Sequence, residues 1–133
     1  MRLRPASWYS GSMNWIQLVL IAAVVALFVV LRRVGLISAG AARQHLKNGA
    51  MIVDVRTDNE HASGHLPRSL HLPLDRIENL LPKRVRDKET VLLLYCQSGM
   101  RSRIARHKAQ ALGYTQAFNL GSLARAGRIV SEK

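Results

Sequence analysis

The strongest fold signal in this chain lies in residues 91–102, which read VLLLYCQSGMRS. The first five of them, Val91 to Tyr95, are apolar throughout, which is typical of a strand buried on both faces of a parallel sheet. A helix is predicted from Arg101 to Leu112, because Ala105, Ala109 and Leu112 share one face and Gly113 is a natural stop. The intervening residues must form a tight loop. This order predicts an α/β domain with a site at the carboxyl end of a strand.

The loop between this strand and helix favours an anion. The first backbone N–H groups of a helix are unpaired, and the helix dipole adds positive charge at the same end. Cys96 opens the loop and is the only cysteine, so no internal disulfide is possible. We expect a low-pKa thiolate here, and not an inert buried thiol. The candidate site is Cys96 as the nucleophile, surrounded by Gln97, Ser98, Gly99, Met100, Arg101 and Ser102.

The segments before the loop predict further alternation of helix and strand. A helix is expected at 39–47, capped by Ser38 and ended by Asn48-Gly49. The apolar run Met51 to Val55 is predicted to be a second buried parallel strand. Residues 56–65 are polar and include a glycine, so they are expected to form a loop or a short helix.

The remaining segments continue the pattern. An extended piece is predicted at Leu70 to Leu74, and Asp75 is expected to cap a helix from Arg76 to Leu81 that stops at Pro82. A last short strand is predicted at 116–120. The prediction is therefore one α/β domain over residues 38–133, with a mostly parallel central sheet flanked by helices.

The N-terminal part has a different composition. Residues 16–31 contain one polar side chain, Gln17, and are followed at once by Arg32-Arg33. We expect an N-terminal tail at 1–13, a transmembrane helix at 14–31 and a linker at 32–37. Arginines directly after the apolar stretch favour a retained anchor over a cleaved signal peptide. The excess of basic residues after the stretch predicts a single-pass membrane protein with its C-terminal domain on the cytoplasmic side.

The charge of the chain limits its partners. A net charge of +12 suits acidic lipid head groups, a small anionic substrate or nucleic acid. The basic runs contain no interleaved aromatic residue, so no nucleic-acid partner is expected.

Several motifs in the predicted domain resemble the rhodanese family. The loop Cys96-Gln97-Ser98-Gly99-Met100-Arg101-Ser102 resembles the family's active loop, Cys-x-x-Gly-x-Arg-Ser. The other matches, in order, are Asp54-Val55-Arg56, Gly64-His65-Leu66-Pro67, Leu72-Pro73-Leu74, Leu112-Gly113-Tyr114 and Asn119-Leu120-Gly121. The likeness covers residues 36–123. Two departures are Arg68, where a glycine is frequent, and the absence of a tryptophan after Gly121, which predicts a reduced last helix.

The resemblance implies a membrane-anchored single-domain sulfurtransferase without a cofactor. Its Cys96 would take sulfur from a small anionic donor such as thiosulfate and hold it as a persulfide. A thiol or a protein sulfur acceptor would then take the sulfur. Arg101 would help hold the donor, while Asp54, Arg56 and Glu60 would support the site. Arg56 and Glu60 are expected to pair with each other, since a buried charge needs a partner.

Three alternatives remain beside this interpretation. A tyrosine phosphatase would have His-Cys, five residues and Arg, whereas Tyr95 precedes Cys96 here and four residues separate it from Arg101. A metal site at His61 and His65 would need a helix, which Gly64 and Pro67 oppose, so no metal site is expected. The competitor from another class is a non-catalytic, membrane-bound rhodanese-like interaction module.

Overall fold

The computed structural model describes residues 14–33 and 35–132, which belong to two compact units divided between Val34 and Gly35. The first unit contains α1 (Trp15–Arg33), and the side chains described in it are exposed. Among the described residues, no helix is both long enough and apolar enough to cross a membrane. The transmembrane helix expected at 14–31 is therefore not supported. A helix does form there, but it has 19 residues and ends in two arginines, while a spanning helix needs about 20 apolar residues.

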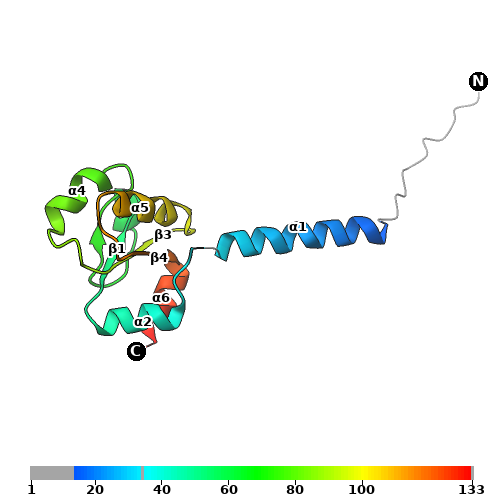
Figure 1. Ribbon diagram of the computed structural model, residues 1–133, viewed down its shortest axis with the longest axis horizontal. Coiled ribbons are helices and arrows are strands. Elements are labelled where there is room, and N and C mark those ends of the chain that lie inside the picture. The colour runs from blue at the N-terminus through cyan, green and yellow to red at the C-terminus, as the bar shows by residue number, and fades with distance from the viewer. Residues whose placement is uncertain (1–13, 34, 133) are drawn as a thin grey trace, which may run out of the picture. The chain divides into compact units, whose positions relative to one another are not determined.

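The second unit is built on a four-stranded sheet in the order β2-β1-β3-β4, in which all neighbouring strands are parallel. Its strands are β1 (Met51–Asp54), β2 (Leu70–His71), β3 (Leu92–Cys96) and β4 (Ala117–Ser122). Its helices are α2 (Ala39–Lys47), α3 (Asp58–Ala62), α4 (Ile77–Arg84), α5 (Met100–Ala111) and α6 (Leu123–Ser131). The predicted α/β class with a parallel sheet is confirmed, as Figure 1 shows.

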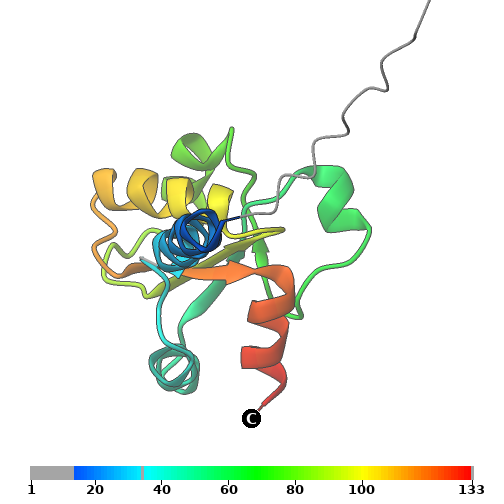
Figure 2. The same ribbon diagram turned by 90° about the vertical axis from the view of Figure 1, so that its right-hand side faces the viewer.

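Helices cover both faces of the sheet (Figures 1 and 2): α4 and α5 lie on one face, α2 and α6 on the other. The core accordingly consists of two clusters. The α4/α5 cluster includes Val53, Val55, Leu72, Ile77, Leu81, Leu92, Leu94, Cys96, Ala105 and Ala109. The α2/α6 cluster includes Ala42, Ile52, Leu66, Leu93, Tyr95, Leu120, Ala126 and Ile129.

The burial of β3 on both faces of the sheet explains its apolar sequence. Every residue from Leu92 to Cys96 is fully buried, and successive side chains point to opposite faces of a strand. Leu94 and Cys96 therefore enter the α4/α5 cluster, while Tyr95 enters the α2/α6 cluster. Because both faces are covered, an uninterrupted apolar run is stable here, and each buried leucine contributes about 2 kcal/mol.

The register of β1 against β3 brings two strand ends together. Asp54 is paired with Tyr95, and the N–H of Val55 donates to the carbonyl of Tyr95 at 3.1 Å. The chain leaving β1 therefore lies beside the chain leaving β3. This is where the loop after β3 begins.

The ends of several helices differ from expectation. Asp75 does not cap α4; the capping position is Arg76, without a side-chain hydrogen bond. The helix also continues through Pro82 to Arg84. Proline costs one hydrogen bond there, but Ile77 and Leu81 are fully buried in the core on the same helix, and this burial offsets the loss.

The start of α2 and the form of residues 56–65 agree with the predictions from the sequence. Ser38 caps α2 by accepting the N–H of Ala41 at 3.2 Å, as predicted. Residues 56–65 contain the short helix α3, one of the two expected forms. The last helix, expected to be reduced, has nine residues and is capped by Ser122.

Candidate active site

Cys96 is the last residue of β3, and its side chain is fully buried. Its sulfur accepts a hydrogen bond from the backbone N–H of Gly99, with an N···S distance of 3.0 Å. The hydroxyl oxygen of Ser102 lies 3.6 Å from the same sulfur. The thiol therefore lies inside the loop that joins β3 to α5.

The shape of this loop depends on Gly99. It precedes α5 with a φ of +94°, a left-handed conformation that glycine adopts with little cost. A Cβ added there would stand 3.5 Å from the backbone of Gly121, which is ordinary contact. Glycine is thus required for the backbone angle more than for space. The turn lets backbone N–H groups converge on the sulfur.

These surroundings favour the thiolate. Burial raises the pKa of the Cys96 thiol, but hydrogen bonds from Ser102, from the N–H of Gly99 and from the N–H of Ser98 outweigh burial and lower the pKa overall. The first turn of α5 contains no acidic residue, so the helix N-terminus adds its positive end without local compensation. The thiolate is the nucleophilic form of cysteine.

Asn119 connects β4 to the end of the loop where α5 begins. Its side-chain oxygen accepts the hydroxyl of Ser102 at 2.7 Å and the N–H of Gly121 at 3.0 Å, and its side-chain nitrogen donates to the carbonyl of Gly99 at 3.4 Å. The side chain is buried. In the sequence, Asn119 stands out only as part of the motif Asn119-Leu120-Gly121. The signal for a site role was an amide within the otherwise apolar run from Ala117 to Leu120.

Arg101, at the start of α5, is held by Glu60 of α3. The two side chains form a double ion pair, with N···O distances of 2.6 and 2.7 Å. Glu60 also accepts the N–H of Thr57 at 3.0 Å, in a capping box at the start of α3. The bonds from Arg101 and Thr57 hold the pKa of Glu60 far below its usual range. The expected pairing of Glu60 with Arg56 is wrong.

Arg56 pairs with Asp54 instead. Both side chains are buried, and the Arg56 guanidinium donates to the two carboxylate oxygens at 2.8 and 3.0 Å. Burial raises the pKa of Asp54, but the bonds from Arg56, from Tyr95 and from His61 lower it to about 2. Asp54 and Arg56 are two residues apart on extended chain, so their side chains point to the same side. Glu60 lies on α3, where its side chain binds Arg101 instead.

The side chains of the remaining predicted residues are exposed. Gln97 is exposed and accepts a hydrogen bond from Arg56 at 3.4 Å, which links the buried ion pair to the loop. The Ser98 side chain is exposed, and only its N–H is directed at the sulfur. The Met100 side chain is 59% exposed. The backbone of the loop therefore forms most of the cradle.

Three stacked histidines reach the Asp54 carboxylate through His61. The ring of His61 stacks on His65, with centroids 3.8 Å apart, and on His71, with centroids 4.0 Å apart. His61 Nδ1 lies 3.1 Å from Asp54 Oδ2. Over the residues that the structure describes, no group of three or more histidine, cysteine or acidic side chains is arranged to hold a metal ion. The histidine stack therefore packs against Asp54, the carboxylate that pairs with Arg56.

Comparison with known proteins gives consistent matches. A family model described as a rhodanese-like domain matches residues 38–123. Thiosulfate sulfurtransferase PspE of Escherichia coli is 28% identical over 71 residues, which is 53% of this chain and 68% of PspE. Human thiosulfate:glutathione sulfurtransferase is 30% identical over 82 residues, covering 53% of this chain and 71% of the human protein.

The fold comparison agrees with the sequence comparison. The structure of the human single-domain sulfurtransferase TSTD1 superposes with a TM-score of 0.60 at 28% identity. The superposition covers 74% of this chain and 97% of the human structure.

Proposed function

Because this chain belongs to the rhodanese-like domain family, we propose that it is a sulfurtransferase that carries sulfane sulfur as a persulfide on Cys96. The donor is a small anion such as thiosulfate, and the acceptor is a thiol or a protein sulfur acceptor. The names of two relatives, thiosulfate sulfurtransferase PspE and thiosulfate:glutathione sulfurtransferase, support this assignment. No cofactor takes part in the proposed reaction.

The observation that carries the proposal is the hydrogen bonding of the Cys96 sulfur. The N–H of Gly99 donates to this sulfur at 3.0 Å, the N–H of Ser98 is also directed at it, and the start of α5 lies next to it. A persulfide adds one further anionic sulfur at this position. Convergent backbone N–H groups at a helix N-terminus bind such an anion without a counter-charge from a side chain.

The reaction takes place in two displacements. The Cys96 thiolate attacks the outer sulfur of thiosulfate, a new S–S bond forms, and the old S–S bond breaks with its electron pair leaving on sulfite. An acceptor thiolate, or cyanide in an assay, then attacks the outer persulfide sulfur. The S–S bond to Cys96 breaks and returns its electron pair to the Cys96 sulfur. Covalent catalysis thus divides one difficult transfer into two simpler steps.

Arg101 has N–H groups available to bind thiosulfate, the proposed source of sulfur. A guanidinium carries five N–H groups, and the double ion pair with Glu60 uses two of them. The others are available to the anionic oxygens of thiosulfate as it approaches Cys96. Asp54 and Arg56 act as support, since they pair with each other and reach the loop only through Gln97.

Mass spectrometry tests the proposal directly. Full-length protein incubated with thiosulfate is expected to gain the mass of one sulfur atom, which cyanide or a reductant removes. The Cys96→Ser variant is the control and should gain nothing. If the wild type retains no sulfur and its thiol titrates as an ordinary cysteine, the sulfurtransferase proposal fails and a non-catalytic interaction module takes its place.

The cytoplasmic position of the domain stays a prediction. Cys96 is the only cysteine, so a membrane-impermeant thiol reagent added to intact cells tests this position. A protein that reacts before the cells are lysed contradicts it. Reaction only after lysis, with permeabilised cells as the positive control, is the expected outcome.

A further inference from the structure

A pocket of about 420 Å³ lies next to the loop that holds Cys96. Its apolar lining comes from Val55, after β1, and from Pro73 and Leu74, before α4. On the α5 side it is lined by Arg101 and Lys108. Of the residues that line this pocket, only Arg101 has a role in the reaction proposed above.

Val55, which lines the pocket, follows β1, and Cys96 ends the neighbouring strand β3. Asp54 of β1 is paired with Tyr95 of β3, so Val55 and Cys96 follow as neighbours across the same ladder. Both side chains belong to the core cluster on the α4/α5 face. Because neighbouring strands lie about 4.8 Å apart, a ligand that rests on Val55 is within reach of the sulfur of Cys96. Arg101 lines the pocket, and the charge of Cys96 is near enough to help raise the pKa of Arg101.

The size of the pocket exceeds what the sulfur donor needs. The transferred atom is a single sulfur, and the Cys96 sulfur that would carry it is already bound by the backbone of the loop. Pockets for organic ligands typically measure about 300 to 1,000 Å³, and this pocket falls in that range. Its volume therefore fits an organic group.

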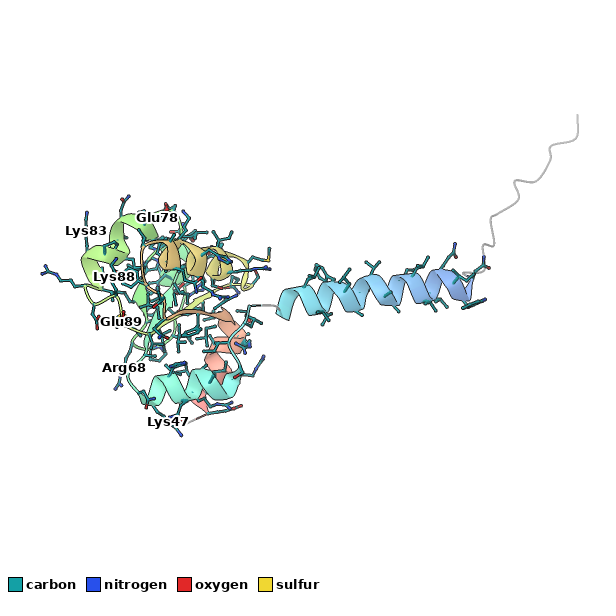
Figure 3. All side chains as sticks on the ribbon, in the orientation of Figure 1. Lys47, Arg68, Glu78, Lys83, Lys88 and Glu89 are labelled. Carbon is teal, nitrogen blue, oxygen red and sulfur yellow. The ribbon has the colours of Figure 1, made fainter. Side chains whose placement is uncertain are left out.

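The charges around the pocket are already paired. Arg101 binds Glu60 at 2.6 Å, and the ammonium of Lys108 binds Glu78 at 2.8 Å. Figure 3 labels Glu78 on α4, across from α5. Asp75 adds a carboxylate to the rim. The pocket has no excess of positive charge, so it suits an uncharged carbon skeleton better than a second anion.

We infer that this pocket binds the carbon skeleton of the sulfur acceptor, a small organic thiol with an apolar chain. The thiol end of this acceptor lies at Cys96 and attacks the outer sulfur of the persulfide, while its chain packs on Val55 and Leu74. The inference rests on the proposed sulfurtransferase function and deepens it by naming the class of acceptor.

The first test compares acceptors of increasing chain length. Full-length protein loaded with one sulfur is mixed with 2-mercaptoethanol, 3-mercapto-1-propanol, 4-mercapto-1-butanol or 6-mercapto-1-hexanol, and the second-order rate constant of persulfide discharge is measured. Each added methylene that becomes buried is expected to raise this constant about fourfold. A rate constant that does not change with chain length overturns the inference.

Two leucines provide a matched pair of variants. Leu74 and Leu80 are both half-buried and pack against the same core cluster, but only Leu74 lines the pocket. In Leu74→Ala the ratio of the rate constant for 6-mercapto-1-hexanol to that for 2-mercaptoethanol is expected to fall toward one. In Leu80→Ala this ratio should equal that of the wild type. Equal ratios in both variants contradict the assignment of the pocket.

A binding measurement separates this inference from the proposed function. The thioether 6-(methylthio)hexan-1-ol cannot accept sulfur, and its titration into the full-length wild type is expected to shift the methyl resonances of Val55 and Leu74 saturably. Binding of the thioether without any sulfur transfer overturns the proposed function and leaves the pocket assigned. Sulfur transfer without thioether binding overturns the pocket and leaves the function.

Discussion

The Cys96 sulfur lies near a hydroxyl that has several acceptors around it. Ser102 Oγ lies 2.7 Å from the side-chain oxygen of Asn119, 3.1 Å from the carbonyl of Gly99 and 3.6 Å from the Cys96 sulfur. A hydroxyl has one proton to donate, and Asn119 is its nearest acceptor. The sulfur competes best as an anion, because hydrogen bonds to charged acceptors are the stronger ones.

Replacing Ser102 is therefore expected to raise the pKa of Cys96. This group has a lowered pKa in the folded protein, so its thiolate is lost as pH falls through that value. In Ser102→Ala the pH profile of iodoacetamide alkylation should move to higher pH. Ser131→Ala, which removes an exposed hydroxyl from α6, should leave the profile in place. A profile that stays fixed in Ser102→Ala contradicts the role of this hydroxyl.

Arg68 adopts a backbone conformation that rarely suits a side chain. Its φ is 59°, the one positive value for a non-glycine residue in the described part of the chain. It also stands where the rhodanese family frequently has glycine. Its side chain is exposed (Figure 3), and a left-handed non-glycine residue costs about 1 to 2 kcal/mol.

Arg68→Gly is expected to stabilise the protein. The free energy gained by relieving the backbone strain exceeds the free-energy cost of a more flexible unfolded chain. The difference leaves a gain of about 0.5 to 1 kcal/mol in the free energy of unfolding. Urea unfolding at neutral pH measures this gain. Gly49→Ala is the opposite control, because Gly49 has a φ of +88° with open space around it, and it should destabilise. A loss of stability in Arg68→Gly would show that its side chain outweighs its backbone strain.

Helices α3 and α5 are connected across the site by one ion pair. Glu60 caps α3 through Thr57 and at the same time binds Arg101 in the first turn of α5. Both members of the pair are about a third exposed, so solvent weakens their attraction, but the double hydrogen bond fixes their geometry. The pair sets the position of α3 relative to the start of α5.

A double-mutant cycle with Glu60→Gln and Arg101→Gln is expected to give a coupling of about 1 kcal/mol in the free energy of unfolding. The pKa of Glu60 is lowered in the folded protein from a usual 4.5. Its contribution is therefore complete above that value and declines as pH falls below it. Urea unfolding at neutral and at acid pH should show the wild type and Glu60→Gln converging in acid. Equal differences at both values of pH would exclude this ion pair as the cause.

The charge of the whole chain, +12 at neutral pH, is expected to speed the approach of anions to Cys96. Iodoacetate and iodoacetamide alkylate a thiolate by the same chemistry and differ in charge. At low salt the ratio of the iodoacetate to the iodoacetamide rate constant should exceed that of a free cysteine. It should fall as salt rises from about 10 to 500 mM, where the screening length drops from about 30 Å to a few ångströms. A ratio independent of salt would show that the net charge does not act at the site.

Most of the domain and the position of its thiol are predictable from short stretches of sequence. The apolar run before Cys96 predicts β3, and the glycine and helix that follow it predict a tight loop. Ser38 predicts the start of α2, because a cap bonds within a few residues of itself. These features depend on contacts between neighbours along the chain, so the local order of residues is enough to predict them.

The partners within the site depend on the packing of the domain. Glu60 and Arg101 are 41 residues apart, and Ser102 and Asn119 are 17 apart. Each charged or polar group has several possible partners in the sequence, which is why the sequence alone predicts, wrongly, that Arg56 pairs with Glu60. Asp54 is nearer to Arg56 on the same side of the extended chain, and α3 directs Glu60 toward α5. Which of these groups meet is set by the order and register of the parallel strands, since that arrangement brings remote segments to one edge of the sheet.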